Sequence, residues 1–171
     1  MDTLDMKKAI IIAIAVAAVA ISAAVYAAGP LFINTTINEA APQAPIDAMM
    51  DKDGDSTTGK PDAMATMVGG TFVGVGDGIH DAQGTARVIP IESGNVLRLE
   101  EFRSTNGPDL YVYLSTDKGA TEFVNLGRLK ANIGNQNYDI PDGTDLSKYD
   151  TVLIWCQQFS VLFGSADLIS S

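Results

Sequence analysis

The stretch TVLIWCQQFSVLF, residues Thr151–Phe163, is the most apolar part of the chain beyond residue 67. It predicts two adjacent strands, Thr151–Gln157 and Phe159–Phe163, that pair at the centre of a sheet-built domain. Successive side chains of a strand point to opposite faces. Cys156 is therefore expected to share a face with Ile154 and to lie in the centre of the domain.

Short strands are also predicted upstream of this pair, with Gly, Pro, Asn and Asp between them. The candidates are Thr71–Val75, Thr85–Ile91, Asn95–Phe102, Leu110–Ser115 and Phe123–Leu126. No amphipathic helix interrupts them. The pattern predicts an all-β domain over residues 67–171, either an antiparallel β-sandwich or a barrel-like sheet.

Two polar clusters are expected to connect these strands. Asn106–Asp109 contains a Gly-Pro pair that favours a turn, so we expect it to join its flanking strands as a hairpin. Asn132–Tyr138 is rich in amide side chains and is predicted to be a loop. A hydrogen-bonded structural loop is favoured there over a ligand-binding loop.

Residues 1–33 are predicted to form a membrane anchor. The sequence has no charged residue from Ala9 to Ile33, and about 20 apolar residues suffice to cross a bilayer as a helix. Lys7 and Lys8 precede this run, and no Lys or Arg follows before Lys52. The positive-inside rule then predicts a single-pass protein of the cell membrane, with a cytoplasmic N-terminus and an extracytoplasmic C-terminal domain. A cleaved signal peptide is the alternative, and it also exports the rest of the chain.

Residues 34–66 have the composition of a flexible, acidic, disordered linker. Within them, Asp51, Asp53 and Asp55 alternate as in a calcium-binding loop. Ser56 stands where an EF-hand requires Gly, and no amphipathic helices flank the segment. A solvated linker is the preferred interpretation, and calcium binding is left open.

Charge and cysteine content exclude several functions. The 171 residues include 11 basic and 21 acidic side chains, a formal net charge of -10, so nucleic-acid binding is not expected. One cysteine cannot build an intramolecular disulfide or a zinc site of several thiolates. His80 is the sole histidine, and no Gly-x-Ser-x-Gly motif is present. No catalytic constellation is recognisable, and no metal site is predicted.

Several motifs occur in an order that resembles the DM13 domain family. They are Gly70-Thr71-Phe72, His80 followed by Gly84-Thr85-Ala86, Leu97–Phe102, Asn106–Leu114, Leu126-Gly127, Gly134–Tyr138 and Val152–Phe163 with its Trp155-Cys156 pair. The resemblance covers about the last hundred residues. It implies a compact extracellular or membrane-tethered β domain that takes part in electron transfer through one cysteine, used either as a bare thiol or to hold a prosthetic group such as haem.

On this resemblance Cys156 is the candidate redox residue, and Cys156 with His80 are the candidate cofactor ligands, because thiolate and imidazole both serve as axial haem ligands. The expected partners are the lipid bilayer and a redox or surface protein. The alternative is a surface-displayed binding or scaffold domain in which Cys156 only packs the core, as unpaired cysteines commonly do.

Overall fold

The computed structural model describes residues 11–20, 33–43 and 68–170. Eleven strands occur in these residues. They are β1 (Thr36–Asn38), β2 (Val68–Thr71), β3 (Val73–Gly74), β4 (Ala82–Ile91), β5 (Gly94–Ser104), β6 (Leu110–Ser115), β7 (Phe123–Arg128), β8 (Ile133–Ile140), β9 (Thr151–Cys156), β10 (Val161–Asp167) and β11 (Ile169–Ser170). The prediction of an all-β domain is confirmed.

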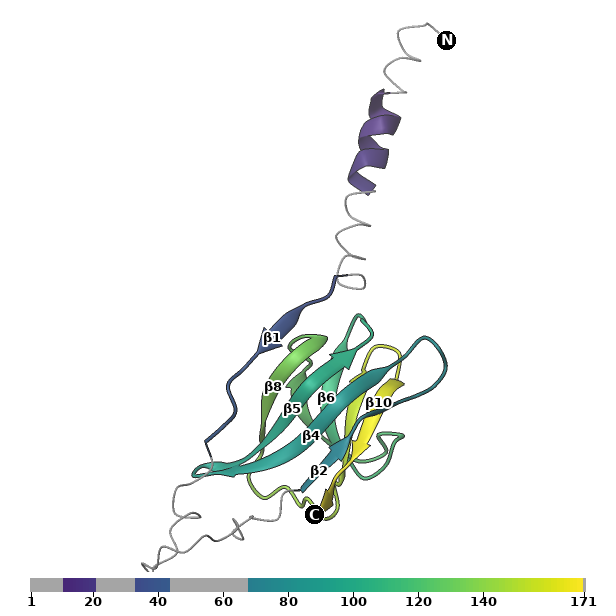
Figure 1. The fold of residues 1–171 in the computed structure, drawn as a ribbon. Helices are drawn as coiled ribbons and strands as arrows, with labels where there is room; N and C mark the ends of the chain where they lie inside the picture. Colours follow the sequence, from purple (N-terminus) through teal and green to yellow (C-terminus); the bar gives the residue numbers. More distant parts are fainter. Residues whose placement is uncertain (1–10, 21–32, 44–67, 171) are drawn as a thin grey trace, which may run out of the picture. The chain divides into compact units, whose positions relative to one another are not determined.

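The strands form two sheets (Figure 1). Sheet A has the order β1-β8-β5-β4-β2-β11, and sheet B has the order β3-β10-β9-β6-β7. Every pairing is antiparallel except that of β1 with β8, which is parallel. The predicted strand pair 151–163 corresponds to the β9–β10 hairpin, and β9 is the central strand of sheet B, as expected.

The core lies between the sheets. Side chains alternate between the two faces of each strand, and those on the inward faces pack together there. Leu97 and Leu99 of β5 and Val152 and Ile154 of β9 are all 0% exposed and belong to one apolar cluster. Burying one such side chain stabilises the fold by about 1.5–3 kcal/mol. The inward face of β9 continues to Cys156, which belongs to the same cluster.

The prediction that Asn106–Asp109 joins its flanking strands as a hairpin is wrong. The segment does turn the chain, but β5 lies in sheet A and β6 lies in sheet B, so it carries the chain from one sheet to the other. Turn residues show where the chain bends, and they do not determine whether the next strand pairs with the previous one. The partner of β6 on one side is β9, far along the sequence.

The prediction of a loop at Asn132–Tyr138 is also wrong, because most of this segment belongs to strand β8. Polar side chains are tolerated in this strand because they have partners. Gln136 is 0% exposed, donates from Nε2 to the Ala131 carbonyl at 2.8 Å, and accepts the Tyr138 hydroxyl at 2.7 Å. Burial raises the pKa of Tyr138, which keeps its hydroxyl protonated as the donor.

Residues 34–40, here called the strap, were predicted to be part of the linker, yet they contain β1 and lie along β8. Glu39 accepts a salt-bridge hydrogen bond from Lys130 Nζ at 2.8 Å and the Asn137 backbone N–H at 2.6 Å. Its carbonyl accepts a hydrogen bond from Arg98 Nη1 at 3.3 Å. Burial alone would raise the pKa of Glu39, but these donors lower it. Sequence patterns missed β1 because its stability comes from contacts with distant residues.

The N-terminal unit, residues 1–33, is separate from the unit of residues 34–171. Its described part is helical over residues 11–20. Among the residues that the structure describes, no helix is long and apolar enough to cross a membrane. The rest of the predicted anchor up to residue 32, and the linker aspartates at positions 51, 53 and 55, lie outside the described residues.

Candidate functional site

Cys156 ends β9 and points into the core, with 1% of its surface exposed. It pairs with Val161 of β10 on one side and with Leu110 of β6 on the other. Its thiol is not part of a disulfide. The position matches the alternation read from the sequence, in which Cys156 and Ile154 share a face.

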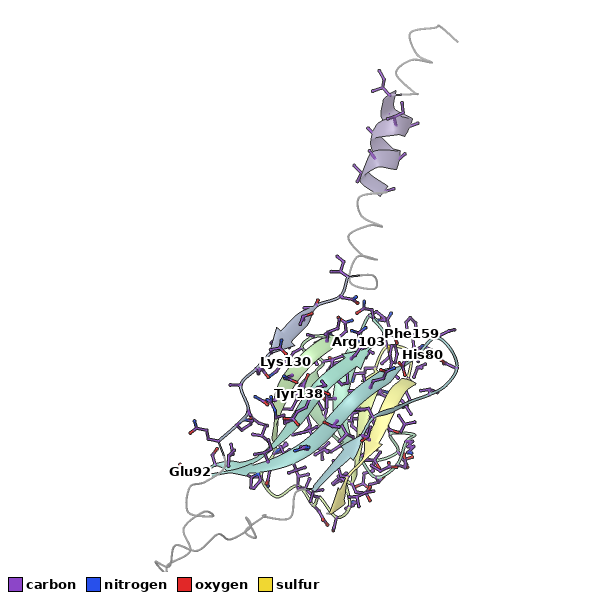
Figure 2. The ribbon with its side chains drawn as sticks, viewed as in Figure 1. His80, Glu92, Arg103, Lys130, Tyr138 and Phe159 are labelled. Atoms are coloured by element: carbon purple, nitrogen blue, oxygen red, sulfur yellow. The ribbon has the colours of Figure 1, made fainter. Side chains whose placement is uncertain are left out.

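Cys156 nevertheless lines a pocket with a volume of about 230 Å³. Three chain segments build the pocket: the loop before β4, the loop between the sheets, and the β9–β10 hairpin. The lining residues are Ile79, His80, Asn106, Gly107, Pro108, Cys156, Phe159, Val161 and Phe163. Ile79 and Phe159 are 70% and 63% exposed, so they form the rim, and Cys156 lies at the buried end. Figure 2 shows the His80 and Phe159 side chains at the same end of the β domain.

His80 is held in this pocket by Asp77. Asp77 Oδ1 accepts the backbone N–H groups of Ile79 at 2.8 Å and His80 at 2.7 Å, and Asp77 Oδ2 lies 2.5 Å from His80 Nδ1. The backbone N–H of His80, its ring nitrogen and the N–H of Ile79 lower the pKa of Asp77 to about 2. The His80 ring also packs against the Phe163 ring, and the two ring centroids are 4.6 Å apart.

A carboxylate on one ring nitrogen fixes the orientation and tautomer of a histidine and leaves the other nitrogen for a ligand. Nε2 of His80 is then the ring nitrogen without a hydrogen-bond partner among the described residues. The sequence identified His80 but not Asp77, although the spacing Asp77-x-x-His80 in a Gly-containing loop is a local signal for such a turn.

The structure therefore brings the two predicted site residues, Cys156 and His80, to one pocket. Among the described residues no hydrogen bond joins them, because every hydrogen bond of His80 goes to Asp77. Also within the described part of the chain, no three His, Cys, Asp or Glu side chains gather as a metal-binding group. The pocket thus has a residue with a thiol and a residue with an imidazole in its lining.

Haem does not fit this pocket. Pockets that enclose drug-sized molecules have volumes of about 300–1,000 Å³, and haem is larger than most such molecules. A cavity of about 230 Å³ cannot enclose it. We therefore derive no chemistry through haem here.

The fold and the site define a compact two-sheet β domain with one buried thiol beside a small pocket. A family model described as "Electron transfer DM13" matches residues 74–168, more than half of the chain. The chain therefore belongs to the DM13 family. Every residue that lines the pocket lies within the matched range, whereas the strap lies outside it. No curated protein and no solved structure matches the chain.

Proposed function

We propose that this protein is an electron-transfer module that works through Cys156, and that its N-terminal segment tethers it to the outer face of a membrane. The observation that carries the proposal is the position of Cys156 in the lining of a pocket. Cys156 is 1% exposed, yet it lines a cavity whose rim reaches solvent. The family description as an electron-transfer domain supports the same function.

Cys156 needs a partner from outside the chain, because the sequence contains no second cysteine. In thiol exchange, its thiolate attacks one sulfur of a partner's disulfide. A new S–S bond forms to Cys156, the partner's S–S bond breaks, and the other sulfur leaves as a thiolate. A thiolate of a second, dithiol partner then attacks the Cys156 sulfur, and the first partner's remaining sulfur leaves as a thiolate. The second partner's other thiolate closes its own disulfide and releases the Cys156 thiolate, so two electrons pass from the second partner to the first through one cysteine.

The proposed tether rests on the sequence. The run Ala9–Ile33 carries no charge, and Lys7 and Lys8 precede it. A single-pass protein with a cytoplasmic N-terminus would present the β domain outside the cell, where its partners are a redox protein and the bilayer itself. Protease treatment of intact and of opened cells tests this orientation. Digestion of the β domain is expected in both, and protection in intact cells contradicts the proposed orientation.

Voltammetry of the full chain in detergent micelles, with a small disulfide added as the external partner and its own wave subtracted, tests the redox role. The wild type is expected to give a redox wave that Cys156→Ser abolishes while the circular dichroism spectrum remains that of a β protein. Val152→Thr is the matched control, since it places a hydroxyl on the same face of β9 and keeps the thiol. A wave that survives in Cys156→Ser, or a wild type with none, contradicts the proposal.

A second function, a surface-displayed binding domain without redox chemistry, is favoured by one observation. Cys156 packs in the main core cluster, and the apolar side chains of Ile79 and Phe159 are exposed close to it. On this alternative Cys156→Ser lowers stability only, and Phe159→Ser weakens partner capture at the cell surface. An electrochemically silent wild type would select this alternative.

A further inference from the structure

We propose that the Cys156 pocket binds the ring of a hydroquinone-class electron carrier, a compact aromatic ring that bears two hydroxyl groups. The geometry points to a ligand with two hydrogen-bond donors, and the choice of a redox-active ring among such ligands rests on the proposed function. His80 and Asn106 bind the two hydroxyl groups of the ring, roles that the family relationship does not supply.

The size and apolar character of the pocket fit one ring. Its volume of about 230 Å³ is below the range of about 300–1,000 Å³ that encloses drug-sized ligands. Phe163 and Val161 line it, and Phe159 stands at its rim. Aromatic rings pack favourably against such rings at centroid separations of about 4.5–7 Å. A single six-membered ring is the natural occupant of a space of this size and character.

His80 supplies the first polar contact. Asp77 is a carboxylate in this structure, so it accepts a hydrogen bond from Nδ1–H and leaves Nε2 without a partner among the described residues. In a neutral imidazole with a proton on Nδ1, Nε2 is a hydrogen-bond acceptor. In the neutral imidazole, Asp77, which lies outside the pocket lining, thus fixes Nε2 of His80 as an acceptor.

Asn106 supplies the second polar contact, and its orientation is determined by a chain of three hydrogen bonds. The backbone N–H of Thr35 donates to Asn132 at 2.7 Å, so the receiving atom is Oδ1. The other atom of that amide, Nδ2, then donates to Asn34 Oδ1 at 2.9 Å. Because Asn34 presents its oxygen, the Asn106 atom 3.2 Å away must be Nδ2. The remaining atom, Asn106 Oδ1, has no partner in the described part of the chain.

The pocket lining therefore includes two side chains that each keep an unpartnered acceptor among the described residues, His80 at Nε2 in the neutral ring and Asn106 at Oδ1, and a neighbour outside the lining orients each. Two acceptors in an apolar pocket are complementary to a ring with two hydroxyl donors, and they leave the donors of such a ring satisfied on binding. They do not complement an anion, which the Asp77 carboxylate also repels. The oxidised quinone, which has only acceptor oxygens, is expected to bind more weakly.

An NMR titration of hydroquinone into the full wild-type chain in detergent micelles tests the inference. The titration is run without oxygen, to keep the probe reduced, and at mildly alkaline pH, which favours a neutral imidazole. The matched ligand is the dimethyl ether of hydroquinone, which keeps the ring and has no donor. Hydroquinone is expected to bind at least about tenfold more tightly, since each satisfied hydrogen bond contributes up to about tenfold. Equal affinity, or no binding of hydroquinone beyond empty micelles, overturns the inference.

Three variants locate the binding site. Asn106→Leu removes the acceptor at nearly constant size and is expected to weaken hydroquinone binding about tenfold. Asn125→Leu is the control, because Asn125 lies on β7 outside the pocket and accepts only the nearby Gly127 N–H. Cys156→Ser is expected to change the affinity less than about threefold. A wild type that gives no Cys156-dependent redox wave but binds hydroquinone would refute the proposed function alone, whereas a wild type that gives the wave but does not bind hydroquinone would refute this inference alone. Equal effects of Asn106→Leu and Asn125→Leu would place the ligand elsewhere.

Discussion

The strap side of sheet A and the Cys156 pocket differ in how their polar atoms are used. Figure 2 labels Lys130 and Tyr138 on the first side and His80 and Phe159 at the second. On the strap side, Asn137, Arg98 and Lys130 bond to one another or to the strap, and Gln136 bonds to Ala131. At the pocket, His80 and Asn106 are each fixed from outside and keep one acceptor available. The many polar side chains of the strap side are therefore used in structural hydrogen bonds. The few polar side chains at the pocket each keep an atom that a ligand can bond to.

The largest effect on stability is expected from a substitution at Gly134, on the strap side. A Cβ at Gly134 would lie against the Ile37 carbonyl of β1, so Gly134→Ala must displace the strap. Gly127→Ala is the control, because Gly127 also has a positive φ, +116° against +106°, but has no atom within 4 Å of the added Cβ. Both substitutions strain the backbone by about 1–3 kcal/mol. Urea denaturation is expected to show about 2 kcal/mol of additional loss for Gly134→Ala, from broken strap hydrogen bonds; equal losses would mean that the strap contributes little.

Cys156→Ser is expected to have the next largest effect on stability. It places a hydroxyl in an apolar core position that is 1% exposed, and the cost of such a change is about 1–3 kcal/mol. Thermal unfolding followed by circular dichroism measures it. A variant as stable as the wild type would indicate that the pocket hydrates position 156, which would sharpen the contrast with the dry core around Ile154.

Glu39→Ala tests the strap through its charge. The substitution removes the partner of Lys130 and of the Asn137 N–H, and we expect a loss of about 1 kcal/mol in the free energy of unfolding. Glu122→Ala is the matched control, since Glu122 pairs with Lys148 at an exposed site, where such a pair contributes about 0–1 kcal/mol. A larger effect at Glu122 would contradict the assignment of the strap as a stabilising element.

The smallest effect is a pH dependence from Asp77. Its pKa is lowered from 3.8 to about 2 in the folded chain, so folding favours the charged form. This contribution is fully present above about pH 4 and is lost as the pH falls through 2, because protonation releases His80 and Ile79. As the pH is lowered from 5 to 2, the free energy of unfolding should fall less steeply for Asp77→Asn than for the wild type. Parallel curves would show that Asp77 does not hold the pocket loop.

The sequence predicted the parts of this fold that depend on local pattern. Alternation correctly predicted the inward face of β9, and turn residues correctly predicted that the chain bends at Asn106–Asp109. Prediction from the sequence failed wherever contacts between distant residues determine the structure. The turn leads into a different sheet because β6 pairs with β9, and the amides of β8 are compatible with a strand because the strap and Ala131 satisfy them.

The candidate site was predicted only in part. Cys156 and His80 were both identified from their chemistry, and the structure places them at one pocket. Asp77 and Asn106 were not identified as site residues. The role of Asn106 follows from contacts with Asn34, 72 positions away, which no local pattern contains. Asp77 is three residues from His80, and its role was readable in principle from that spacing.

The parallel pairing of β1 with β8 has a practical consequence for anyone who shortens this chain. The matched family range begins at residue 74 and omits the strap. A fragment cut there would leave the backbone N–H and C=O groups of β8 along an open sheet edge, and such edges promote aggregation. It would also lose the Asn34 contact that fixes Asn106. A recombinant fragment that starts at residue 34 retains both features.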